Sequence, residues 1–147
     1  MGPHASTGAK GRTVTELIDI IDTHLAAYAE PDPVRRRGLI IEAWRPDGRL
    51  VEPPMDAEGH DAIHEMAGTV QDQFPGAKFH RVTSVDGHHG YARYGWELVT
   101  EGRGVVLAGT DVVRVGEDGR LAGVLGFFGD IPDRPGSAPR RRPAEEL

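Results

Sequence analysis

Asp111 is the residue of this sequence whose surroundings most directly suggest chemistry. It lies inside an apolar, strand-like run, GTDVVRVGEDGRLAGVLGFFGD, over residues 109–130. A carboxylate is costly to bury unless a partner stabilises it or a raised pKa keeps it protonated. Asp111 is therefore either a candidate acid or base in a pocket, or a carboxyl group that closes the core through hydrogen bonds.

His24 is the second candidate, because it falls on the apolar stripe of a predicted helix. It follows Ile21 by three residues and precedes Tyr28 by four, which is the spacing of one helix face. Thr13 and Glu16 fit a capping box at the start of this helix, which we predict over residues 14–29. His24 is therefore expected to face inward.

The remaining elements alternate between helical and strand patterns. Two further helices are predicted over residues 33–44 and 60–74, and strands over residues 49–53, 77–85, 90–100, 105–115 and 121–128. The last strands are separated by short Gly-containing turns, which join antiparallel neighbours. Prolines in the strand over residues 49–53 predict that it lies at a sheet edge.

The composition predicts one domain and argues against certain kinds of binding partner. The 147 residues are 38% hydrophobic, with 17 basic and 23 acidic side chains, a net charge of −6 and no cysteine. We expect a domain over residues 13–131, a flexible arm over residues 1–12 and a disordered tail over residues 132–147. The acidic balance argues against a nucleic-acid partner, and no apolar run is long enough for a membrane span, so a cytoplasmic protein is expected.

The element order α-α-β-α-β-β-β-β, with the segments HLAAYAEPD, VEPP, GHDAI, DVVRVGEDGRL and FFGD, resembles the nuclear transport factor 2-like superfamily. This superfamily includes ketosteroid isomerases and SnoaL-like polyketide cyclases. The resemblance covers residues 14–131 and implies an α+β fold, a cone-shaped curved antiparallel sheet wrapped around three helices. It also implies a small apolar, carbonyl-containing ligand in the cone and a homodimer through the outer sheet face, with the candidate contacts Val106, Ala108, Val112 and Ala122.

The resemblance also assigns roles, position by position. Ketosteroid isomerases use an aspartate base together with a tyrosine and a protonated aspartate that stabilise an oxyanion. Asp111 falls at the protonated aspartate, His24 at the tyrosine and Pro53 at the base. Proline cannot accept a proton, and strand alternation predicts that neighbouring Glu52 points to the opposite face.

Asp111 and His24 are accordingly the candidate catalytic residues of an isomerase or cyclase. They could polarise a carbonyl together, or Asp111 could be the acid/base, as the resemblance to polyketide cyclases implies. Alternatively the two side chains hydrogen-bond each other and the domain is a non-catalytic ligand-binding or dimeric scaffold module. Tyr28, Tyr94, Trp96, His80 and Phe128 are the candidate ligand-binding residues, with Tyr94 and Trp96 on the more apolar face of their strand.

Neither a metal nor a cofactor is predicted. His60 and His64 are four residues apart on a predicted helix, but a third ligand is missing. His88 and His89 are adjacent in a turn, where neighbouring side chains are expected to diverge.

Overall fold

The first helix begins where its capping residues predict. The computed structural model describes residues 13–136, so the arm predicted over residues 1–12 and most of the predicted tail lie outside the described residues. In α1 (Val14–Ala29), the Thr13 hydroxyl accepts from the Glu16 amide at 3.0 Å, and the Glu16 carboxylate accepts from the Thr13 amide at 2.9 Å. His24 and Tyr28 lie on the buried side of this helix.

The other two helices are held against each other and against the sheet. They are α2 (Pro33–Ala43) and α3 (His60–Gln73). His60 Nε2 donates to the Trp44 carbonyl at 2.9 Å, and His64 Nε2 donates to the Pro33 carbonyl at 3.1 Å. Among residues 13–136 no helix has the length and apolar character needed to cross a membrane.

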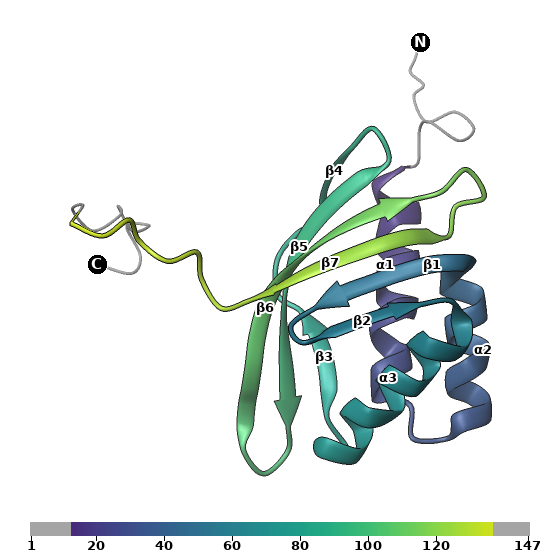
Figure 1. Ribbon diagram of the computed structural model, residues 1–147, viewed down its shortest axis with the longest axis horizontal. Helices are drawn as coiled ribbons and strands as arrows, with labels where there is room; N and C mark the ends of the chain where they lie inside the picture. The colour runs from purple at the N-terminus through teal and green to yellow at the C-terminus, as the bar shows by residue number, and fades with distance from the viewer. Residues whose placement is uncertain (1–12, 137–147) are drawn as a thin grey trace.

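One curved sheet contains all strands of the described chain (Figure 1). Its order is β2-β1-β7-β6-β5-β3, with β4 also paired to β5, and only the β1–β7 pairing is parallel. The strands are β1 (Trp44–Glu52), β2 (Met55–Glu58), β3 (Lys78–Arg81), β4 (Asp86–His88), β5 (Tyr91–Thr100), β6 (Gly104–Val115) and β7 (Leu121–Phe128).

Two predicted strands differ from the observed ones. The strand expected over residues 49–53 is not an edge strand, because β1 lies between β2 and β7. Pro53 and Pro54 form the turn after β1 and therefore remove no hydrogen bond from its interior. The strand expected over residues 77–85 is shorter than predicted, because β3 ends at Arg81, and the predicted turn that follows contains β4; both β3 and β4 pair with β5.

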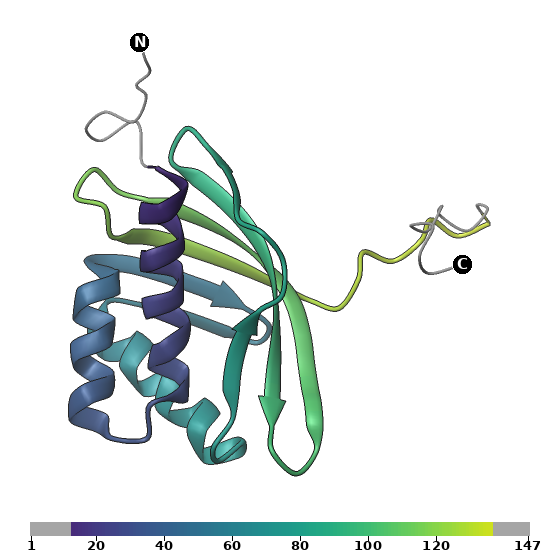
Figure 2. The same ribbon diagram turned by 180° about the vertical axis from the view of Figure 1, so that it is seen from behind.

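The three helices cover one face of the sheet (Figure 2). Alternate residues of β5 point toward them, as predicted, and are buried: Ala92, Tyr94, Trp96 and Leu98. Because this concave face carries the core, any internal site of the described chain must be built from these alternate strand positions and from α1.

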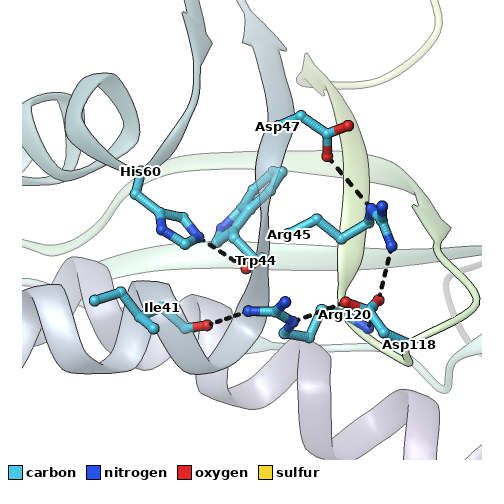
Figure 3. Close-up of polar contacts among 7 residues, drawn as sticks. All are labelled: Ile41, Trp44, Arg45, Asp47, His60, Asp118 and Arg120. Atoms are coloured by element: carbon cyan, nitrogen blue, oxygen red, sulfur yellow. Dashed lines mark hydrogen bonds and ion pairs between the residues drawn. The ribbon is translucent and has the colours of Figure 1, made fainter.

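A polar cluster connects the β6–β7 turn and the start of β1 to α2 (Figure 3). Arg120, after the β6–β7 turn, donates to the Ile41 carbonyl at 3.1 Å and pairs with Asp118 at 2.9 Å. Asp118 also pairs with Arg45 of β1 at 3.2 Å. These contacts hold the β6–β7 hairpin and the start of β1 in place, and the carboxyl groups of Glu52 and Asp111 lie farther along β1 and β6.

Candidate active site

Asp111 lies on β6 and is held by two donors from the neighbouring strand. The Tyr94 hydroxyl donates to Asp111 Oδ2 and Trp96 Nε1 donates to Asp111 Oδ1, both at 2.8 Å. Asp111 is only 4% exposed. The partners of Asp111 are therefore residues of β5, whereas the sequence had suggested His24.

The electrostatics of Asp111 reflect two opposing effects. Burial raises the pKa of Asp111 to about 6, and the hydrogen bonds from Tyr94 and Trp96 oppose that rise because they stabilise the carboxylate. Both oxygens already accept hydrogen bonds. At neutral pH, Asp111 is thus suited to be an anion, and not the neutral, donating acid suggested by the resemblance.

Glu52, at the end of β1, brings a second carboxyl group to the same place. A Cβ atom added to Gly126 of β7 would lie 3.0 Å from Asp111 Oδ1 and 3.1 Å from Glu52 Cβ. The two acidic side chains therefore flank this glycine. Burial, together with the negative charge of Asp111, raises the pKa of Glu52 to about 7.

The position of Glu52 corrects an expectation from the sequence. Pro53 is exposed in the turn, whereas Glu52 shares the inward direction of Leu50, two residues earlier, which is fully buried. Counting strand alternation from Leu50, the apolar residue of the strand, would have identified Glu52. Counting from Pro53 failed because Pro53 does not belong to the strand.

Tyr28 of α1 adds a donor beside the carboxyl groups. Its hydroxyl is the one buried side-chain polar atom of residues 13–136 without a hydrogen-bond partner. Burial and the negative charges of Glu52 and Asp111 raise its pKa well above the ordinary value, so it keeps its proton. The Tyr28 backbone is fixed by Gln71, whose side-chain amide donates to the Tyr28 carbonyl.

His24 supports this tyrosine from inside the core. Trp44 Nε1 donates to His24 Nδ1 at 3.2 Å, and burial lowers the pKa of His24 to about 3. The ring is therefore neutral, with its proton on Nε2. Its edge-on contact with Tyr28, at 5.3 Å between ring centroids, gives His24 a role in packing Tyr28 in place.

A row of aromatic rings leads from Tyr28 toward the surface. Tyr28 contacts Phe79 at 5.2 Å between centroids, Phe79 contacts Trp96 at 5.1 Å, and Trp96 contacts Phe128 at 6.0 Å. Phe128 is 38% exposed. His80 is exposed and points away from this row, because the inward position of β3 is occupied by Phe79.

The residues of this cluster differ in exposure. Asp111, Tyr28, Tyr94 and Trp96 are almost completely buried, whereas Glu52 and Phe79 are half-buried. Glu52 is therefore the more exposed of the two carboxyl groups. Residues 13–136 contain no group of three or more His, Cys, Asp or Glu side chains arranged to hold a metal ion.

The sheet and helices define a class of protein. A curved, mostly antiparallel sheet around three helices is the α+β cone of the nuclear transport factor 2-like, or cystatin-like, fold, as predicted. A family model described as SnoaL-like domain matches residues 21–124. The chain belongs to the SnoaL-like domain family.

Solved structures extend this comparison. A protein from Agrobacterium tumefaciens, described as a proposed isomerase of the SnoaL-like family, has 37% identity and a TM-score of 0.74, over 79% of this chain and 99% of its own. A proposed polyketide cyclase from Sinorhizobium meliloti has 18% identity and a TM-score of 0.58, over 78% and 99%. The second likeness shows the fold alone. A comparison with curated proteins finds no match.

Proposed function

We propose that this protein is an acid/base catalyst of the isomerase or cyclase type, acting on a small apolar carbonyl compound bound in the cone. The observation that carries the proposal is the cluster of two carboxyl groups with raised pKa values beside a buried tyrosine hydroxyl that has no partner. Groups with pKa values near the working pH are the most effective proton carriers. The similarity to a proposed isomerase supports the same reaction class.

In this proposal Glu52 moves the proton. As a carboxylate it removes a proton from the carbon next to the carbonyl group. The electron pair of the broken C–H bond forms a carbon–carbon double bond, and the π pair of the carbonyl group moves to its oxygen. Tyr28 donates a hydrogen bond to the oxygen as its negative charge develops. Glu52 then returns the same proton to another carbon of the conjugated system, so that substrate and product are isomers.

Asp111 and His24 have supporting roles in this mechanism. Asp111 remains an anion and makes Glu52 a stronger base, because a nearby negative charge disfavours a second one. His24 packs Tyr28 in place. Trp96 and Phe128 offer flat apolar surfaces to the ligand.

The test is turnover of a panel of small cyclic enones by the parent protein and by Glu52→Gln, with binding followed by tryptophan fluorescence. We expect Glu52→Gln to reduce turnover by about 10²- to 10⁴-fold with binding retained. Glu58→Gln, an exposed glutamate on β2, is the matched control and should retain full activity. Equal turnover in the parent and Glu52→Gln would contradict the role of Glu52.

Two further outcomes would select the alternatives. If Asp111→Asn abolishes turnover and Glu52→Gln does not, Asp111 is the acid/base. If an enone binds in the cone but neither protein converts any member of the panel, the domain is a non-catalytic binding module.

We further propose that two copies associate through the outer face of the sheet. Val112 lies opposite Leu125, and Thr110 lies opposite Phe127, on strands β6 and β7. Phe127 is 55% exposed and Leu125 is 44% exposed, and the helices of the described chain lie on the other face (Figure 2). Two earlier candidates contribute little, because Ala122 is buried and Val106 is half-buried.

A further inference from the structure

Two adjacent histidines, His88 at the end of β4 and His89 in the turn to β5, have side chains that converge. His88 Nδ1 and His89 Nδ1 are 3.1 Å apart, and the two rings lie at 80° to each other. Neighbouring side chains on a strand point to opposite faces, but His89 has a φ of 51°, in the left-handed region. This backbone conformation turns the second ring back toward the first, contrary to the divergence expected from the sequence.

The spacing of the two nitrogens fits a shared metal ion. Nitrogen ligands lie about 2.0–2.1 Å from Zn²⁺ and subtend about 109° in a tetrahedral site. The nitrogen–nitrogen separation is then about 3.3–3.4 Å, and it falls to about 2.9 Å when the angle is about 90°, as in a tetragonal Cu²⁺ site. The observed 3.1 Å lies between these two values.

Both rings are accessible, as is that of His80, whereas the other three histidines of the described chain are buried or already engaged. His60 and His64 each use Nε2 to donate to a main-chain carbonyl, and His24 is buried. His88 and His89 are exposed. His88 borders a cavity of about 320 Å³ and His89 borders one of about 630 Å³, so water can complete a coordination shell on either side.

We propose that His88 and His89 form a two-histidine chelate for a divalent transition metal, with Cu²⁺ bound most tightly. Imidazole suits Cu²⁺, Ni²⁺ and Zn²⁺, and Cu²⁺ forms the strongest complexes of the series. In the metal-free pair one ring donates its Nδ1 proton to the other. When the metal binds through both Nδ1 atoms, that ring becomes the Nε2 tautomer, so no proton is lost from the pair. This site is independent of the carboxyl pair around Asp111.

The test is a Cu²⁺ titration of the full chain carrying His4→Ala, which removes the histidine outside the described residues. Calorimetry gives the affinity, and amide NMR spectra at low Cu²⁺ locate the ion through paramagnetic broadening. We expect broadening centred on residues 86–91. His88→Ala and His89→Gly should each weaken binding by roughly 100-fold, because each leaves one imidazole where two acted together.

His64→Ala provides the matched control, since it removes a histidine whose Nε2 is already engaged, and it should leave the affinity unchanged. His89→Gly is chosen because glycine adopts a positive φ readily, so a loss of binding cannot be attributed to a disrupted turn. Broadening centred elsewhere, or affinities unchanged in both histidine variants, would overturn the proposal.

Discussion

Glu52 carries a pKa of about 7 in the folded protein, so it should make stability depend on pH. Its pKa is raised above the unfolded value, and the folded state therefore holds the proton more tightly. The stabilisation is complete below about pH 4.5 and is lost as the pH rises through 7. We expect the parent to lose about 2 kcal/mol relative to Glu52→Gln between pH 5 and pH 8.

Urea denaturation of both proteins at several pH values measures this difference. The comparison with Glu52→Gln matters because His24, with its lowered pKa, has the opposite sign: its stabilisation grows as the pH rises from about 3 to 6.5. Both proteins share that contribution, so it cancels. Parallel pH profiles would contradict the raised pKa of Glu52.

Removal of the Tyr28 hydroxyl should affect stability and turnover differently. A buried hydroxyl without a partner costs about 1–3 kcal/mol, and the Tyr28 hydroxyl is such a group. Tyr28→Phe should therefore leave the free energy of unfolding unchanged or raise it by about 1 kcal/mol, while turnover falls. Chemical denaturation and enone turnover measure the two effects.

Tyr94→Phe is the control, because it removes a hydroxyl that donates to Asp111. Leaving that buried carboxylate with one donor fewer should cost about 1–3 kcal/mol. If Tyr28→Phe destabilised the protein as much as Tyr94→Phe does, the Tyr28 hydroxyl would have a structural partner and the proposed oxyanion role would be wrong.

The sequence revealed single residues better than their partners. Asp111 was found because a carboxylate in an apolar run is unusual, and Tyr94 and Trp96 because strand alternation placed them inside. Their hydrogen bonds depend on the register of β5 against β6, where Tyr94 faces Asp111. Short turns and a bulge between Leu98 and Val99 set that register, and residue spacing alone does not determine it.

At the level of the elements, a glycine lets Trp96 reach Asp111. Trp96 lies opposite Gly109 across β5 and β6. A Cβ atom at Gly109 would lie 2.3 Å from the Phe127 carbonyl oxygen and 2.5 Å from the Trp96 ring. Both distances are much shorter than van der Waals contact. The Trp96 indole can therefore pack over β6 only because residue 109 has no side chain.

Gly109→Ala should therefore destabilise the protein by about 2–4 kcal/mol and displace the Trp96 indole from Asp111. Thermal unfolding and the near-ultraviolet circular dichroism of tryptophan measure these changes. Gly123→Ala is the matched control on β7, because its Cβ would meet only the Arg49 carbonyl at 3.7 Å. Equal effects of the two substitutions would show that the loss of a strand glycine, and not the clash with Trp96, is responsible.

The three helices and the strands β5, β6 and β7 were predicted to within about a residue, whereas β1 was predicted only over its second half and β2 and β4 were not predicted. The helices were recognised from apolar periodicity and capping residues, which operate within a few residues of the chain. The three shortest strands, β2, β3 and β4, span only three or four residues. So few residues do not show a recognisable alternation of apolar and polar side chains. Their existence depends on pairing with β1 and β5, and the sequence does not display these long-range contacts.

At the scale of the whole molecule, the three helices cover one face of the sheet, and the described chain does not cover the other, outer face with a helix. The fold class followed from the element order and from the resemblance to a known superfamily. The set of residues exposed on the outer face depends on bulges, which shift the register of neighbouring strands. One such register shift, between Arg114 and Val115, accompanies the burial of Ala122. The exposed apolar residues of β6 and β7 include Val112, Leu125 and Phe127.

A dimer through that face should be concentration-dependent and sensitive to charge. Phe127→Lys places an ammonium group at the centre of the proposed contact, where it would be desolvated without a partner. We expect light scattering to show a dimer for the parent at micromolar concentration and a monomer for Phe127→Lys. Val34→Lys, at a more exposed position on α2, should remain dimeric. Because the carboxyl pair lies within one chain, the monomer should keep its turnover per site. A monomeric parent would show that the proposed dimer does not form. A Phe127→Lys protein that still dimerises would show that the interface lies elsewhere.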